Sequence, residues 1–226
     1  MHQEGKYAIV SPVLGNIYEY TNFLFGFTQS LKLLKKNPEI IIAAMKELLK
    51  YWKNYIKTFY EEVEGHIDII CINGDLGEQS GPIINPDLYR KYIKPLDREF
   101  SEFIHKLGPV KINYHCCGST TSFLQDFIDV GYDAYNPVQL GAYDMDSKTL
   151  KQRFGDKITF WGGLCDTKIL GFGTPMDVKK EVIKNIENFK PNGGYIAANI
   201  HNITAEVKPE NIVAMFDTAF EYGTYN

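Results

Sequence analysis

One short stretch of the chain places a histidine and two cysteines where a predicted strand gives way to a loop. Residues 110–119 begin with alternating apolar side chains and continue through His115, Cys116 and Cys117. Side chains of a strand alternate between its two faces, so His115 and Cys117 share one side and Cys116 packs on the other. Zinc accepts both His and Cys readily, so the pair predicts part of a metal site. The alternative is a buried thiol beside a hydrogen-bonded histidine.

Polar side chains stand at four further predicted strand ends. In an alternating β/α chain these ends meet at one face, where the chemistry of such folds collects. We therefore expect the side chains to converge. They are Asp75 and Glu78 after strand 67–72, Asn136 and Gln139 at strand 133–136, Cys165 and Asp166 after strand 158–161, and His201 and Asn202 after strand 195–200.

A catalytic zinc site uses three protein ligands and keeps one position open. His115 and Cys117 would need one more ligand, for which the candidates are His201, Cys165, Asp75 and Glu78. Each candidate has a structural alternative. The carboxylates can bond loop amides, Cys165 can be a small buried apolar residue, and Asn136 and Asn202 can simply hold loops.

The chain repeats strand, loop and helix about six times, with apolar strands typical of a buried parallel sheet. An open doubly wound sheet and a (β/α)8 TIM barrel both fit. The barrel is favoured because polar and Gly-rich residues follow nearly every strand. The expected strands are 7–11, 67–72, 110–114, 133–136, 158–161 and 195–200; the expected helices are 17–24, one starting at Pro38, 88–107, 123–130, 148–154, 176–188 and 210–222.

Composition excludes several classes of protein. The 226 residues suit one domain, 1–226, with a net charge of −4 and no basic run, which argues against nucleic-acid binding. Neither a phosphate-binding Gly-rich motif nor an apolar run of membrane-spanning length is present. The polar start predicts no signal peptide, so we expect a cytoplasmic protein with four reduced cysteines.

Taken in order, a set of motifs resembles the uroporphyrinogen decarboxylase superfamily, and this likeness covers almost the whole chain. The resemblance implies a TIM barrel and one of two chemistries. These are cofactor-free decarboxylation of uroporphyrinogen, or zinc-dependent methyl transfer to or from a corrinoid protein. The motifs are 74–82 with 89–95, 114–119, 135–139, 161–163 with 172–175, and 198–203 with 209–213.

The methyltransferase branch is the first hypothesis. Its His-x-Cys-Gly zinc motif maps onto His115, Cys117 and Gly118. The third ligand of coenzyme M methyltransferases, a Cys, falls at His201, which also fits the decarboxylases. The resemblance implies a small-molecule substrate and a corrinoid carried by a separate protein. We expect the catalytic residues to be Asp75, Glu78, His201, Asn136 and Gln139.

Two alternatives remain. Uroporphyrinogen decarboxylase itself captures a multiply charged carboxylate with an Arg-rich motif that this chain lacks, its only arginines being Arg90, Arg98 and Arg153. Members of the superfamily are longer, however, and the chain resembles the C-terminal two-thirds of the barrel, without the first one or two strands. The other alternative is therefore a truncated or non-catalytic barrel that a partner chain or a homo-oligomer completes.

Overall fold

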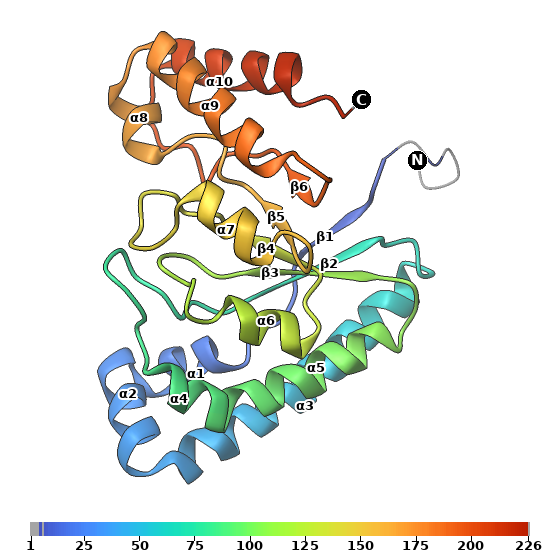
Figure 1. Cartoon of the computed structure of the whole chain (residues 1–226). Helices are drawn as coiled ribbons and strands as arrows, with labels where there is room; N and C mark the ends of the chain where they lie inside the picture. The colour runs from blue at the N-terminus through green and yellow to red at the C-terminus, as the bar shows by residue number, and fades with distance from the viewer. Residues whose placement is uncertain (1–4, 6, 226) are drawn as a thin grey trace. The chain divides into compact units, whose positions relative to one another are not determined.

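The computed structural model describes residue 5 and residues 7–225 (Figure 1). The chain forms two compact units. Unit 1 runs to Leu76 and includes Pro82–Cys116 and Ser122–Asp133. Unit 2 consists of Gly77–Gly81, Cys117–Thr121 and the chain from Ala134 onward.

Three parallel strands form the sheet of unit 1: β1 (Val10–Val13), β2 (Ile69–Asn73) and β3 (Lys111–His115). Their order in the sheet follows the sequence. The register pairs Asn73 with His115, so β2 and β3 end side by side. This shared end places the residues that follow β2 next to those that follow β3.

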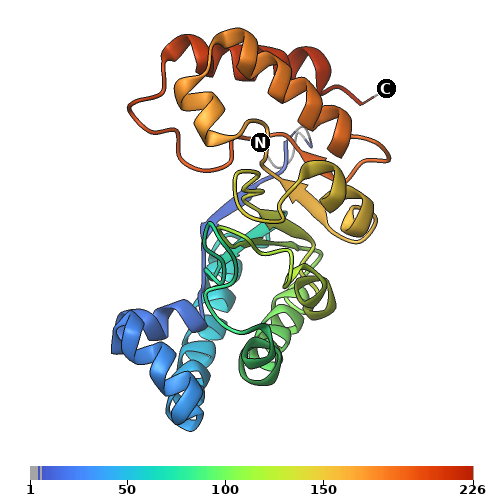
Figure 2. The ribbon, with the colours of Figure 1, turned by 60° about the vertical axis from the view of Figure 1, so that its left-hand side comes forward.

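The helices of unit 1 bury one apolar face each. Helix α3 shows the pattern best, because Ile41, Met45, Leu49, Trp52 and Ile56 are buried at the spacing that the sequence predicts. Helices α3 and α5 lie side by side in both views (Figures 1 and 2). The helical segments are α1 (Tyr18–Phe25), α2 (Phe27–Lys36), α3 (Pro38–Glu62), α4 (Pro86–Leu88), the π-helical turn η2 (Tyr89–Ile93), α5 (Lys94–His105) and α6 (Leu124–Val130).

Unit 2 contains three more parallel strands, β4 (Ala134–Asn136), β5 (Thr159–Trp161) and β6 (Tyr195–Ile196), again in sequence order. Its longest helices, α9 and α10, pack against each other (Figure 2). A reciprocal cap between Thr174 and Asp177 fixes the start of α9. The helices are α7 (Ser147–Phe154), α8 (Thr167–Phe172), α9 (Pro175–Phe189) and α10 (Pro209–Tyr222).

The expected class, α/β with parallel strands, is confirmed. The expected strand 195–200 is wrong in length, because β6 ends at Ile196. Its neighbour β5 stops at Trp161, and Gly162 and Gly163 then turn away with φ of 117° and 70°, so β6 has little to pair with. Helices α2 and α8 fall where no helix was expected.

The start of α3 also differs in detail from the expectation. Pro38 occupies the first turn as predicted, but the Asn37 side chain makes no capping hydrogen bond. Although α3 has 25 residues, neither it nor another helix of the described chain is both long and apolar enough to cross a membrane.

Candidate functional site

His115 is the last residue of β3 and is half-buried in unit 1. Its carbonyl oxygen accepts a 3.0 Å hydrogen bond from Gly74 N–H, which ties the end of β3 to the loop after β2. The next residue, Cys116, is fully buried, and its Sγ accepts a hydrogen bond from Leu76 N–H at 3.3 Å. Cys116 thus packs in the interior, as its place in the strand predicts.

The loop that carries Cys117 is held by backbone contacts within unit 2. Gly118 has a φ of +82° and donates its N–H to Oε1 of Gln139 at 2.8 Å. Ser119 N–H donates to the carbonyl oxygen of Glu78, also at 2.8 Å. A Cβ on Gly118 would lie 2.5 Å from the carbonyl carbon of Gly77, so these two loops meet backbone to backbone. The position of Cys117 is therefore fixed from three directions.

Cys117 and His201 come together in unit 2, with their candidate ligand atoms within 4.8 Å of each other. Cys117 is half-buried and His201 is exposed, so the thiol and the ring can be reached from solvent. His115 precedes Cys117 by two positions, so the chain itself keeps these two residues close. One cysteine and two histidines are a donor set that zinc accepts.

The His201 ring already has a local role. Its Nδ1 accepts a 2.7 Å hydrogen bond from Asn202 N–H, and its carbonyl oxygen accepts from the Asn199 side chain. A neutral ring that accepts at Nδ1 carries its proton on Nε2. Coordination through Nε2 would need the other tautomer and would break the bond to Asn202.

The remaining strand-end residues have identified surroundings. Asn136 Nδ2 donates to the carbonyl oxygen of Trp161 at 3.0 Å, which links the ends of β4 and β5. Glu78 is exposed, and its Oε1 accepts from Ser80 Oγ at 2.7 Å. Cys165 is buried, which raises the pKa of its thiol to about 12 and disfavours the thiolate that zinc binds. Within the part of the chain that the structure describes, only His115, Cys117 and His201 form a metal-ligating group.

Glu19 was not expected from the sequence but belongs to the same face of unit 1. Its Oε2 accepts from Asn73 Nδ2 at 3.1 Å and also from Asn16 Nδ2. The backbone N–H of Asp75 donates to the same carboxylate. The available signal was the spacing Asn16-x-x-Glu19 directly after the first strand, which resembles a helix-start pattern rather than a site.

Residues 21–222 match the family model described as Uroporphyrinogen decarboxylase (URO-D). This match spans most of the chain. The chain belongs to the uroporphyrinogen decarboxylase family. Two curated relatives, both named uroporphyrinogen decarboxylase, support this. The protein of Methylococcus capsulatus is 29% identical over 101 residues, covering 44% of this chain and 27% of the relative. The protein of Vesicomyosocius okutanii is 37% identical over 68 residues, covering 30% and 19%.

A solved structure of this fold is the methyltransferase from Methanosarcina mazei, with a TM-score of 0.74 and 18% sequence identity. The similarity covers 98% of this chain and 62% of that protein. The expected TIM-barrel type of fold is thus confirmed, with six of the eight strands of a complete barrel among the described residues.

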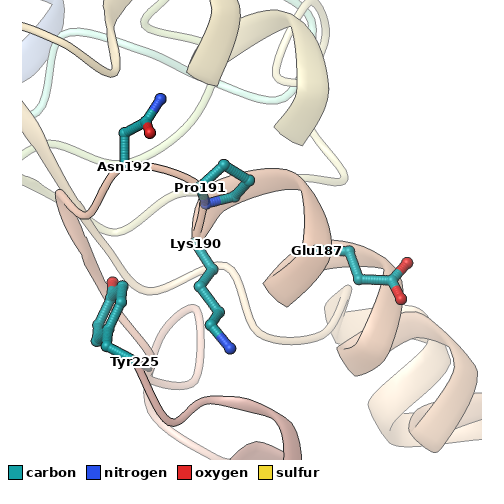
Figure 3. A pocket seen from close by; sticks show the side chains of 5 residues that line it. All are labelled: Glu187, Lys190, Pro191, Asn192 and Tyr225. Carbon is teal, nitrogen blue, oxygen red and sulfur yellow. The ribbon is translucent and has the colours of Figure 1, made fainter.

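This family member also has a pocket in unit 2 that the strand-end residues do not line. Its volume is about 370 Å³, and Lys190 beside it donates to the carbonyl oxygen of Tyr222 at 3.3 Å. Figure 3 shows the lining side chains, one acid and one base without a histidine or cysteine. We assign no chemistry to it. The lining residues are Glu187, Lys190, Pro191, Asn192 and Tyr225.

Proposed function

We propose that the chain catalyses zinc-dependent methyl transfer between a small methylated substrate or thiol and a corrinoid carried by a separate protein. The observation that supports this best is the approach of Cys117 to His201 within 4.8 Å, two residues after His115. Cofactor-free decarboxylation has no use for a zinc donor set. The name of the structural neighbour, a methyltransferase, agrees with this choice.

The donor atoms suit the metal. Zinc bonds of about 2.0–2.3 Å in a tetrahedral site place ligand atoms roughly 3.3–3.8 Å apart. A separation within 4.8 Å between Cys117 and His201 needs only a small closure. The exposed position of His201 allows its ring to turn and exchange its bond to Asn202 for a metal bond. His115, Cys117 and His201 would hold the ion and leave one position for substrate.

Bound zinc would supply Lewis acidity, which stabilises a thiolate or polarises a methyl-bearing heteroatom. The protein's own groups do the rest. Gln139 and the Glu78 carbonyl oxygen orient the loop of Cys117. Asn136 fixes the neighbouring strand end. Asp75, at the end of β2, provides the carboxyl group that accepts or returns a proton.

Decarboxylation is the second candidate, because both curated relatives are named uroporphyrinogen decarboxylase. Its substrate is rich in carboxylates, and arginine is the usual residue for capturing them. The three arginines of the chain are all engaged within the described fold. Arg90 bonds Asp126 at 3.0 Å, Arg98 donates to the Asp129 carbonyl oxygen, and Arg153 lies 3.8 Å from Asp144. This arrangement favours methyl transfer.

A corrinoid assay separates the two candidates. Zinc-loaded protein is mixed with methylcobalamin and a panel of small thiols, and loss of the methylcobalamin absorbance is followed. We expect thiol-dependent loss that His115→Ala and Cys117→Ser abolish. Release of CO2 from uroporphyrinogen, without methyl transfer to any thiol, would instead establish the decarboxylase.

A further inference from the structure

Glu19 connects helix α1 to the strand end that carries Asp75. Its carboxylate accepts hydrogen bonds from the side chains of Asn16 and Asn73 and from the backbone N–H of Asp75. Asn73 closes β2, and Asp75 follows two positions later. All these residues belong to unit 1. Glu19 therefore acts on the Asp75 loop directly, rather than through the packing of the helix.

The surroundings of Glu19 contain a second carboxyl group and no close cation. Glu19 is half-buried, and burial, followed by the negative charge of Asp75, raises its pKa, while the amide donors oppose that shift. None of the ion pairs within the described residues includes Glu19. Two carboxyl groups in this position resist the simultaneous loss of both protons.

The elements packed around Glu19 supply few other titratable groups. Helix α3 contributes Trp52, whose indole N–H donates to the Asn16 carbonyl oxygen at 2.8 Å. On α1 itself, burial raises the pKa of Tyr18 to about 12, so its hydroxyl stays neutral. On β3, His115 is the register partner of Asn73, whereas the exposed Lys111 lies at the opposite strand end. The lysines of α2, Lys32, Lys35 and Lys36, are exposed. Asp75 is thus the group that acts on the Glu19 charge.

We propose that Glu19 is a positioning residue for Asp75: it holds the Asp75 loop by the backbone N–H and shares one proton with the Asp75 carboxyl group. The pair then carries one negative charge and one exchangeable proton. This inference rests on the proposed function, in which Asp75 handles a proton. When the S–H bond of a thiol breaks as its S–CH3 bond forms, the released proton passes to the ionised carboxylate of the pair.

A purely structural contact makes a different prediction from a shared proton. If Glu19 only anchors α1 to the loop, its titration does not depend on the ionisation of Asp75. If the two groups share a proton, they titrate as a coupled pair, and each signal reports both ionisation steps. A titration of the side chains therefore distinguishes the two explanations, without substrate, metal or corrinoid.

The experiment is an NMR titration of protein labelled with ¹³C at the Asp and Glu side-chain carboxyl groups. We expect the Glu19 signal of the wild type to move in two steps, with its main step above the ordinary value of about 4.3. Asp75→Asn should leave one step and lower the proton affinity of Glu19 by about fivefold, which corresponds to two unit charges about 4 Å apart in water.

The control is Asp87→Asn, an exposed carboxylate of the same unit, which should leave the Glu19 titration unchanged. A single Glu19 step in the wild type, or an unchanged step in Asp75→Asn, would overturn the inference. The wild-type measurement decides even if a variant fails to fold. Coupled titration without methyl transfer would refute the function alone, whereas methyl transfer with independent titration would refute only the role of Glu19.

Discussion

The backbone N–H of Gly118 donates a 2.8 Å hydrogen bond to Oε1 of Gln139. A side chain that follows β4 thereby fixes the loop that carries Cys117, within unit 2. Residues that hold a metal-ligating loop in this way matter for metal affinity nearly as much as the ligands themselves. The role of Gln139 is therefore to hold the site in position rather than to bind the ion.

Replacing Gln139 with Leu should weaken zinc binding by about 10–100-fold, because the Cys117 loop loses a fixed partner. Competition with a coloured chelator measures the affinity. The matched control is Gln152→Leu, an exposed glutamine of α7 in the same unit, which should bind zinc like the wild type. Equal affinity in both variants would show that this hydrogen bond does not support the site.

Gly118→Ala should destabilise the protein by about 1–3 kcal/mol, because a φ of +82° is costly for alanine and its Cβ would meet Gly77. Urea unfolding gives the free energy of unfolding. Gly171→Ala is the control, since no heavy atom lies within 4 Å of its added Cβ. That helical position should be neutral or slightly stabilised. Similar losses in both variants would mean that the contact with Gly77 relaxes freely.

Most of the elements could be predicted from the sequence, and the reasons are local. The apolar stripe from Ile41 to Ile56 fixes α3 by itself. The short β6 could not be predicted, because its length depends on where the neighbouring β5 turns away at Gly162. Helix α2, with four polar or charged residues in KLLKK and its flanks, lacks the long apolar stripe that identifies α3.

The candidate site was predictable only in part for the same reason. Alternation along β3 separates Cys117 from the buried Cys116, as expected. Which distant residue meets Cys117 depends on the fold, so His201, Cys165, Asp75 and Glu78 remained open in the sequence. The roles of Asp75, Glu78, Asn136 and Gln139 stay predictions, as do the partner protein and the single domain. Glu19 was missed because its partners lie in distant parts of the chain.

Asp97 should make the stability of the protein depend on pH. It is buried, with Tyr89 OH donating to its Oδ2 at 2.9 Å, and burial raises the pKa of Asp97 to about 7. A raised carboxyl pKa contributes stability below the unfolded value of about 3.9 and loses it as the pH rises through about 7. Asn in this position still accepts from Tyr89 but never ionises.

Asp97→Asn should therefore gain stability relative to the wild type as the pH rises, by a few kcal/mol at most between about pH 4 and 8. Urea unfolding of both proteins across this range measures the difference. Asp87→Asn, which changes an exposed carboxylate, should follow the wild type. Parallel pH profiles for Asp97→Asn and the wild type would contradict the account of this buried carboxyl group.

The four cysteines should differ in reactivity. Cys71, Cys116 and Cys165 are buried, whereas Cys117 is half-buried. Burial raises the pKa of the Cys71 thiol and brings that of Cys165 to about 12, which suppresses their thiolates. Brief treatment of the native protein with iodoacetamide should modify Cys117 first, as peptide mass spectrometry would show. Modification of Cys165 at the same rate would contradict the burial pattern.

Zinc content tests the central claim most directly. Protein prepared under reducing conditions and dialysed against a zinc buffer is analysed by elemental mass spectrometry, in the wild type and in His115→Ala, Cys117→Ser and His201→Ala. The controls are His66→Ala and Cys165→Ala. The account predicts about one zinc per chain in the wild type and the controls, and its loss in the three site variants. A metal-free wild type, or zinc retained in full by Cys117→Ser, would contradict it.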